Sequence, residues 1–192
     1  MTRLLVAPDS FKGTFSAVEV AAAIGRGAAR AGAVVDLCPV ADGGEGTMAV
    51  LGGRAVSVRV HDPLGRSVEA AYSVLDDGRA VVEMAAASGL GLVAEHERDP
   101  WAASTFGTGE LIRAAVETGA FEVLVAVGGS ATVDGGRGAL EALADVVVPP
   151  IAVLCDVETP WERSAEVFGP QKGADPEMVR RLASRLASYA AE

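Results

Sequence analysis

The stretch from Val123 to Gly138, VLVAVGGSATVDGGRG, contains the strongest structural signal in the chain. Its first five residues are apolar and mostly β-branched, which predicts a buried strand. Two pairs of glycines then flank a Ser-Ala-Thr step, and a helical pattern follows. A strand, a glycine-rich turn and a helix start in succession are typical of α/β proteins, and backbone N–H groups at such a turn bind anions. The stretch therefore predicts a site for phosphate or carboxylate groups.

The N-terminal segment repeats this grammar. Residues 4–7 form a predicted strand, and the turn Pro8–Thr14 leads to a helix predicted over residues 17–31. Ser16 and Glu19 have the spacing of a capping box at its start, and Gly32 is suited to its end. A second strand is predicted over residues 34–38. This β-α-β order indicates a parallel sheet.

The middle of the chain follows a different pattern, with alternating strands and tight turns that predict antiparallel pairing. A second subdomain is therefore expected to start near residue 56. Thr108 is predicted to cap a helix from Gly109 to Glu117, and Asp175 is predicted to cap a final helix that begins at Pro176. The other predicted elements are strands 54–60, 67–75, 80–84, 122–127 and 151–155 and a helix over 136–145.

Composition excludes several classes of function. The chain has 192 residues and a formal net charge of −10, which argues against a nucleic-acid surface because phosphate backbones need a basic face. No stretch has transmembrane length and the N-terminus does not fit a signal peptide, so no membrane partner and a cytoplasmic location are expected. Cys38 and Cys155 are predicted to be reduced core thiols. His61 and His96 are predicted to be ordinary surface or loop residues without a metal.

The turn Pro8–Thr14 places polar side chains where α/β sheets bind ligands. Asp9 could coordinate Mg²⁺ or accept a proton, Ser10 could donate a hydrogen bond, and Lys12 could neutralise a phosphoryl or carboxylate oxygen. The alternative is a simple turn with capping side chains and a solvated lysine. The spacing is not that of a Walker loop.

A second cluster, Asp42–Thr47, reads DGGEGT and places Asp42 and Glu45 around Gly43 and Gly44. Acids at a helix start are favoured by the helix dipole, so a structural cap explains part of this pattern. Glycines do not improve a cap, however, and they allow close approach to the backbone. A binding or metal site is therefore the favoured interpretation.

The third cluster, Gly128–Gly136, contains Gly129 and two potential donors to phosphate or carboxylate, Ser130 and Thr132, and ends in Asp134, which could bind Mg²⁺. It lacks the GxGxxG fingerprint, which argues against a dinucleotide fold. The alternative is a turn required only by tight strand–helix packing. Weaker candidates are Asp156 at the end of a strand, Lys172 after a turn, and the glycine-flanked helix start 105–110.

These segments, taken together, resemble the bacterial glycerate kinase family of type I. The blocks that carry the resemblance, in the family's order, are residues 7–17, 39–47, 62–66, 82–90, 105–112, 127–136 and 167–174. The resemblance implies phosphorylation of D-glycerate to 2- or 3-phosphoglycerate, with ATP and Mg²⁺, in the cytosol. It also implies an α/β fold with a parallel Rossmann- or flavodoxin-like portion, residues 1–55, and a mixed α/β second domain with an antiparallel hairpin, residues 56–192. The active site would lie between the two.

The roles expected from residues and resemblance together follow from the needs of phosphoryl transfer. Asp9, Lys12, Asp42 and Asp134 are predicted to be catalytic, and Asp156 is predicted to bind the metal. The predicted substrate- or phosphate-binding residues are Ser10, Gly43, Gly44, Glu45, Gly128, Gly129, Ser130, Thr132 and Lys172.

Two rival functions stay open at this stage. Members of the resembled family are longer, so the chain is expected to correspond to their N-terminal portion, and a catalytically incomplete protein that only binds glycerate or phosphate is one alternative. An unrelated sugar-phosphate or nucleotide-binding α/β enzyme, such as an oxidoreductase, is the other. The oligomeric state is left open, although an exposed apolar face would favour self-association.

Overall fold

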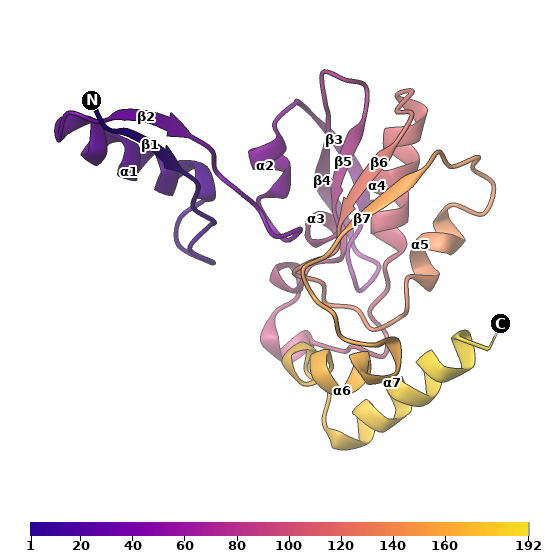
Figure 1. Ribbon diagram of the computed structural model, residues 1–192. Helices are drawn as coiled ribbons and strands as arrows, with labels where there is room; N and C mark the ends of the chain where they lie inside the picture. The colour runs from indigo at the N-terminus through magenta and orange to yellow at the C-terminus, as the bar shows by residue number, and fades with distance from the viewer. Residues whose placement is uncertain (192) are drawn as a thin grey trace.

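The computed structural model describes residues 1–191, which form two lobes joined by a thin connection (Figure 1). The small lobe, residues 1–38, contains β1 (Arg3–Val6), α1 (Ala17–Arg30) and β2 (Val34–Leu37). The two strands pair in parallel, with Arg3 opposite Val34 and Val6 opposite Leu37. The predicted β-α-β unit is therefore confirmed.

Helix α1 covers only one face of this two-stranded sheet. It packs closely because Gly25 faces Leu37, where a Cβ on the glycine would lie 2.7 Å from the leucine Cδ2 atom. Side chains alternate along a strand, so Leu5 belongs to the opposite face, and it is 69% exposed. The capping box predicted at Ser16 and Glu19 is present. One face of the small lobe is thus built and the other is bare.

The large lobe, residues 41–191, is organised around a five-stranded sheet in the order β3-β4-β5-β6-β7. Its first two pairings are antiparallel and its last two are parallel. The fold class is therefore as predicted, with a parallel portion and an antiparallel hairpin. The strand bounds are β3 Arg54–His61, β4 Ser67–Val74, β5 Ala80–Glu83, β6 Val123–Ala126 and β7 Ile151–Leu154. Residues 54 and 55 pair within this sheet, while the domain boundary after residue 55 stays a prediction.

Helices complete the large lobe. Helix α4 (Phe106–Glu117) packs across the sheet, with Leu111 and Ala115 fully buried against Tyr72 and Val82. The remaining helices are α2 Thr47–Leu51, α3 Ala85–Ser88, α5 Arg137–Ala142, α6 Ser164–Phe168 and α7 Pro176–Tyr189, with 3₁₀ turns η1 Leu90–Leu92, η2 Glu95–Glu97, η3 Trp161–Arg163 and η4 Pro170–Lys172. Helices α3 and α6 and the 3₁₀ turns were not predicted.

Helices α6 and α7 form a second, smaller core beneath the sheet (Figure 1). Leu182 and Leu186 of α7 pack there against Ala165 and Val133. Asp175 caps α7 as predicted, because its side chain accepts from the Met178 N–H. This core holds the segment that carries Lys172 against the rest of the lobe.

Two local predictions are wrong. Helix α4 begins at Phe106, so Thr108 lies inside its first turn, where its hydroxyl is bonded to Ser88 Oγ at 2.7 Å instead of capping the helix. Cys38 and Cys155 are free but exposed, because each directly follows an edge strand and not a buried one. No helix within residues 1–191 is long and apolar enough to cross a membrane.

Candidate active site

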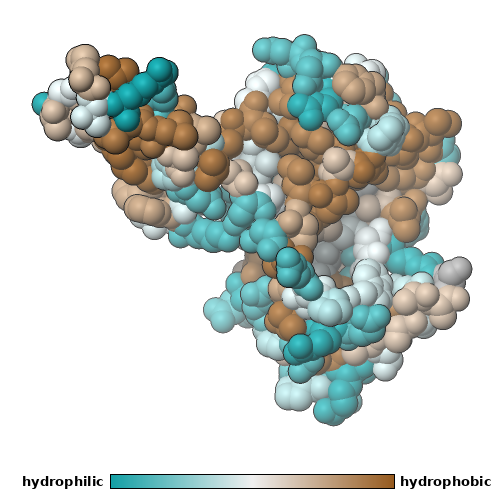
Figure 2. All heavy atoms as spheres, in the orientation of Figure 1, coloured by the Kyte–Doolittle hydropathy of each residue, from teal (hydrophilic) through white to brown (hydrophobic). Residues whose placement is uncertain are grey.

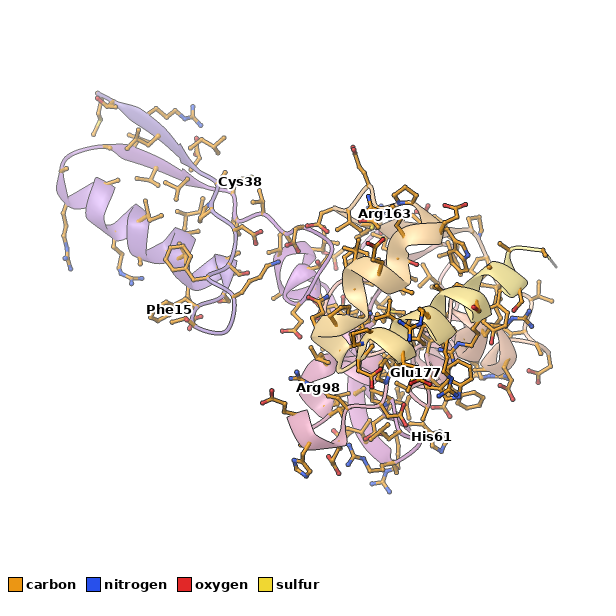
Figure 3. All side chains as sticks on the ribbon, turned by 90° about the horizontal axis from the view of Figure 1, so that it is seen from below. Phe15, Cys38, His61, Arg98, Arg163 and Glu177 are labelled. Atoms are coloured by element: carbon orange, nitrogen blue, oxygen red, sulfur yellow. The ribbon has the colours of Figure 1, made fainter. Side chains whose placement is uncertain are left out.

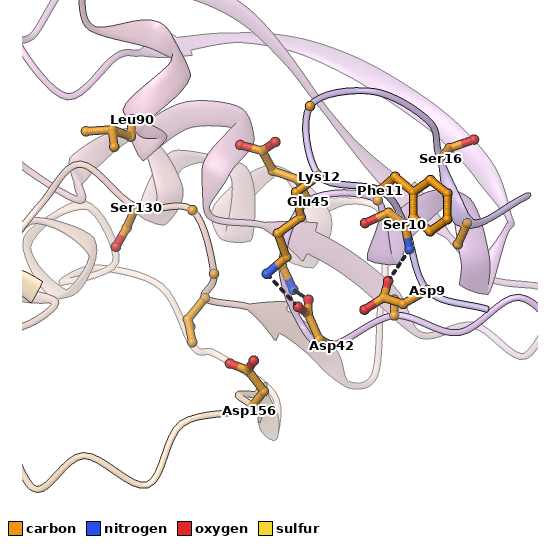
Figure 4. A pocket seen from close by; sticks show the side chains of 18 of the residues that line it. Asp9, Ser10, Phe11, Lys12, Ser16, Asp42, Glu45, Leu90, Ser130 and Asp156 are labelled. Carbon is orange, nitrogen blue, oxygen red and sulfur yellow. Dashed lines mark hydrogen bonds and ion pairs between the residues drawn. The ribbon is translucent and has the colours of Figure 1, made fainter. Parts of the chain in front are cut away.

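A cleft of about 830 Å³ lies between the lobes (Figure 4). Its walls are the segments that follow β1, β6 and β7, together with the connection between the lobes and the 168–172 segment. Carboxyl ends of parallel strands are where open α/β sheets bind ligands. Most of the predicted site residues line this cleft: Asp9, Ser10, Lys12, Asp42, Gly44, Glu45, Gly128, Gly129, Ser130, Asp156 and Lys172.

Lys12 and Asp42 link the two lobes across the cleft. The Lys12 Nζ atom lies 3.0 Å from Asp42 Oδ2, and Asp42 Oδ1 accepts from the Gly44 N–H at 2.9 Å. The hydrogen bond from Lys12 lowers the pKa of the Asp42 carboxyl and raises the pKa of the Lys12 ammonium. Both groups are thus charged at neutral pH. The Lys12 side chain is 80% exposed, so its ammonium is accessible to an incoming anion.

Gly43 does not line the cleft but fixes its floor. Its carbonyl accepts from the Gly128 N–H at 3.0 Å, and a Cβ on Gly43 would lie 2.6 Å from the Leu154 carbonyl oxygen. A Cβ on Gly128 would lie 2.6 Å from the Gly44 Cα atom. These glycines are needed because the connection between the lobes lies directly on the ends of β6 and β7.

Glu83, at the end of β5, is a structural residue that the sequence interpretation missed. Its Oε1 atom accepts from the N–H groups of Gly46 and Met48, at 3.1 and 2.6 Å, and so caps helix α2. Glu45 is therefore free of the capping role that the sequence offered as an alternative, and it lies beside the cleft. The cap comes from a residue 37 positions away, which no local pattern reveals.

The loop after β6 is held from behind by two of the other blocks. Leu90 N–H donates to the Gly129 carbonyl at 2.8 Å, and Ala131 N–H donates to the Ser88 carbonyl at 2.8 Å. The Ser88 hydroxyl is in turn bonded to Thr108 of α4. Ser130 therefore lies in a backbone of fixed shape.

Lys172 lies under the same loop and is almost fully buried. Its Nζ atom donates to Ser130 Oγ at 2.9 Å and to the Thr132 carbonyl at 2.6 Å. Burial lowers the pKa of the Lys172 ammonium to about 8. Thr132 itself is buried outside the cleft and contributes its carbonyl to Lys172.

Asp134 is placed outside the cleft and is buried. Its carboxylate accepts from the Thr105 N–H at 2.8 Å, the Thr105 hydroxyl at 2.7 Å, the Gly138 N–H at 3.2 Å and the Gly136 N–H at 3.3 Å. These donors join the starts of α4 and α5. The geometry gives the predicted catalytic role of Asp134 no support and assigns it a structural one.

Two acids of the cleft have oxygens available for a cation. Within residues 1–191, Asp9 accepts only from the Ser10 N–H, at 2.6 Å, and the Asp156 carboxylate makes no hydrogen bond. Groups of three or more metal-ligating side chains are absent from these residues. Mg²⁺ needs only one or two carboxylates when substrate phosphates and water complete its shell, so Asp9 and Asp156 fit it. Both lie near the Lys12–Asp42 pair (Figure 4).

The cleft also has an apolar wall that the sequence interpretation missed. Phe11 lies in the turn that carries Lys12, Phe15 directly follows that turn, and both residues are more than half exposed. Val157 and Phe168 line the cleft from the large lobe. The sequence carried one signal for this wall, because a chain with only 5% aromatic residues has two of them, Phe11 and Phe15, on either side of Lys12.

Comparison with known proteins identifies the family of this chain. The model of the glycerate kinase family matches residues 4–149 and 146–192, which is nearly the whole chain. The chain belongs to the glycerate kinase family. The two matched segments meet at residues 146–149, in the connection between α5 and β7.

Individual relatives agree with this assignment. The chain is 39% identical to the glycerate kinase of Bacillus subtilis (strain 168) and 38% identical to the glycerate 2-kinase of Escherichia coli (strain K12), each over 229 aligned residues. The crystal structure of a protein assigned as glycerate kinase 2 of Salmonella typhimurium LT2 superposes with a TM-score of 0.86 at 38% identity and covers 99% of this chain. The chain itself spans 60% of the two enzymes and 62% of the Salmonella protein.

Proposed function

We propose that the cleft catalyses transfer of the γ-phosphoryl group of ATP to a hydroxyl of D-glycerate. The observation that carries the proposal is the convergence of three kinds of group on one cleft. These are a basic side chain from each lobe, the Gly129 and Ser130 N–H groups, which have no hydrogen-bond acceptor within residues 1–191, and carboxylates with oxygens available for a cation. Membership of the glycerate kinase family supports the choice of substrates.

The chemistry needs positioning and charge neutralisation more than covalent catalysis. The substrate hydroxyl oxygen attacks the γ-phosphorus, the bond from that phosphorus to the bridging oxygen breaks, and ADP leaves with the bond electrons. Lys12 offsets negative charge on the transferred group. The hydroxyl proton passes to a cleft carboxylate, for which Asp9 is the best placed because Asp42 is paired with Lys12.

Asp156 would hold Mg²⁺, which would supply positive charge to neutralise the phosphates, and Asp9 would stay available to take the hydroxyl proton. The cleft already carries an excess of carboxylates over ammonium groups, since Asp9, Asp42, Glu45 and Asp156 face Lys12 and Lys172. Trianionic or tetra-anionic ATP would be repelled by this set without a divalent cation. The surplus acids are thus consistent with a metal–nucleotide complex as the donor.

The size of the cleft suits two substrates. A volume of about 830 Å³ is near the upper part of the range for small-molecule sites and exceeds what a three-carbon acid fills. Phe11 and Phe15 give one wall an apolar surface on which a nucleobase can stack. We place the reaction in the cytoplasm, where ATP is available.

The test is an assay of ADP release from the purified chain with D-glycerate, ATP and Mg²⁺, with the product identified by NMR. Turnover that falls at least 100-fold in Lys12→Met supports the proposal. The Escherichia coli relative is named a 2-kinase, so 2-phosphoglycerate is the expected product. A folded chain that shows a thermal shift with glycerate or phosphate but no turnover would instead support the binding-only alternative.

A further inference from the structure

The chain has sixteen basic residues, of which only Lys12 and Lys172 are lysines, and both line the cleft. Their environments are opposite. Lys12 is exposed and paired with Asp42, while Lys172 is 7% exposed and has no carboxylate partner within hydrogen-bond distance. Burial of an ammonium group is unfavourable unless hydrogen bonds to surrounding groups compensate for the lost water. The contacts of Lys172 show what it serves.

The hydrogen bond between Lys172 and Ser130 has a defined direction. An ammonium group has donors only, so the Ser130 oxygen must accept from Nζ, at 2.9 Å. The hydroxyl proton of Ser130 is then free to be donated elsewhere. A hydroxyl that accepts from a cation is also a stronger donor, because neighbouring hydrogen bonds polarise one another.

The backbone of the same loop adds two more donors. The N–H groups of Gly129 and Ser130 make no hydrogen bond with any group in residues 1–191, and both residues line the cleft. Gly129 has a φ of +74°, the left-handed conformation that turns successive N–H groups toward one side. The two N–H groups and the Ser130 hydroxyl are thus three donors that have no acceptor within residues 1–191.

We propose that Lys172 is a positioning residue that acts through Ser130, fixing its hydroxyl so that this hydroxyl and the Gly129 and Ser130 N–H groups bind an oxyanion of a substrate. The inference rests on the proposed function, in which that oxyanion is either the carboxylate of glycerate or the transferred phosphoryl group.

The bond from Lys172 to the Thr132 carbonyl offers a purely structural explanation, in which the lysine only fastens η4 to the loop. The two explanations differ in coupling. If Lys172 acts through Ser130, removal of the lysine has no further effect on substrate binding once the hydroxyl is gone. A fastening role gives losses that add, or stability losses with unchanged kinetic constants.

The protonation of Lys172 provides a second distinction, since its pKa is lowered to about 8. The charged groups around it are Asp134 of the adjoining loop, Arg98 and Asp99 beside the segment, and Glu45 and Asp156 of the cleft. Below pH 8 the ammonium is present and fixes the Ser130 oxygen as an acceptor, so the hydroxyl proton points elsewhere. As the pH rises through 8 the charge is lost, so substrate affinity should weaken there.

The kinetic test compares Lys172→Met, Ser130→Ala and the double variant. We expect each single variant to raise one KM about 10- to 100-fold, the range for a charge-assisted hydrogen bond, with a smaller change in kcat. The double variant should be no worse than Ser130→Ala. A rise in the KM for glycerate assigns the carboxylate, and a rise in the KM for ATP assigns the phosphoryl group. Arg163→Met, which removes an exposed cation that does not line the cleft, is the matched control.

A test without turnover uses the two lysines as probes. With [ε-¹³C]lysine the chain gives two side-chain signals, which Lys12→Met assigns, and the Lys172 signal should titrate near pH 8. D-glycerate or inorganic phosphate should raise that pKa, because a bound anion favours the ammonium. Additive losses in the double variant, or a Lys172 titration that neither probe moves, would overturn the inference. Absence of turnover in the wild-type assay would overturn only the proposed function, since the titration does not depend on it.

Discussion

Both lobes contain a β-α-β unit, but the strand residues of the large lobe are much more deeply buried than those of the small lobe. All four residues of β6 in the large lobe are buried, whereas only Val6 is buried among the four residues of β1. The large lobe is closed by α4 and by a second core beneath it, while the small lobe has a helix on one face only. Figure 3 shows the small lobe, with Phe15 and Cys38, standing apart from the body that carries His61 and Arg98.

The difference shows that the cleft combines a rigid wall with a weakly supported one. A two-stranded sheet is marginally stable by itself, and elements with few buried contacts open most easily. Apolar side chains gather on the visible surface of the small lobe and over β7 (Figure 2). Leu5 and Val34 in the small lobe and Val153 in β7 are among those exposed. Lys12, Asp9, Phe11 and Phe15 thus depend on the less stable lobe.

The largest expected effect comes from matched leucines in the two lobes. Leu111→Ala removes a fully buried side chain from the large core and should lower the free energy of unfolding by about 2–5 kcal/mol. Leu5→Ala, on the bare face of the small lobe, should change it by less than about 0.5 kcal/mol. Urea unfolding of both variants measures this. Equal losses would break the comparison and mean that something covers the bare face.

The second effect concerns Asp134. Asp134→Asn removes a charged acceptor of four buried or partly buried donors and should cost about 2–3 kcal/mol of stability, within the large lobe alone. At a temperature where the variant is folded, kcat should stay within a few-fold of the wild type. A variant of normal stability that has lost turnover would restore the catalytic role predicted from the sequence.

A smaller loss of stability is expected when one helix cap is removed in each lobe. Ser16→Ala in α1 and Asp175→Ala in α7 each remove one cap and should each cost about 1 kcal/mol in local stability. We expect the small lobe to open separately because few of its strand residues are buried, so Ser16→Ala should speed amide hydrogen exchange in α1 without changing exchange in β6. If β6 responds equally, the lobes unfold as one unit.

The smallest effect on stability is expected at the link between the lobes. Lys12→Met removes an exposed ion pair and should change the free energy of unfolding by at most about 1 kcal/mol. The pKa of the Asp42 carboxyl, which Lys12 lowers, should rise toward its ordinary value. NMR titration of Asp42 measures the rise. A pKa that stays low would show that the Gly44 N–H, and not Lys12, dominates.

Signals confined to a few adjacent residues predicted much of the fold. The capping box at Ser16, the Asp175 cap and the hairpin before β5 all depend on neighbours within four positions, so the sequence reveals them. The Thr108 cap failed because a tertiary partner, Ser88, engages that hydroxyl. Local pattern alone did not show that Thr105 lies at the start of the helix.

The sequence predicted which segments line the cleft better than it predicted what each residue does there. Glycine-rich turns after strands marked the segments that converge on the cleft. The partners within it are distant in sequence, as with Lys172 and Ser130, 42 positions apart, or Thr105 and Asp134, 29 apart. Contacts between residues so far apart in sequence determine which polar groups face the cleft and which are hydrogen-bonded inside the protein. Asp134 and Thr132 were therefore predicted as site residues, although both lie behind the cleft wall.

The contact of Gly43 and Gly44 with β6 and β7 has a mechanical consequence. The connection is fastened to the large lobe from Gly43 onward, and on the other side the Val40 N–H donates to the Pro8 carbonyl of the small lobe at 3.0 Å. A rotation of the small lobe would therefore have its pivot at residues 41 and 42. The turn that carries Lys12 belongs to the small lobe, which is the part that would rotate. A rotation there would carry Lys12, Phe11 and Phe15 together relative to the part of the cleft wall that the large lobe supplies.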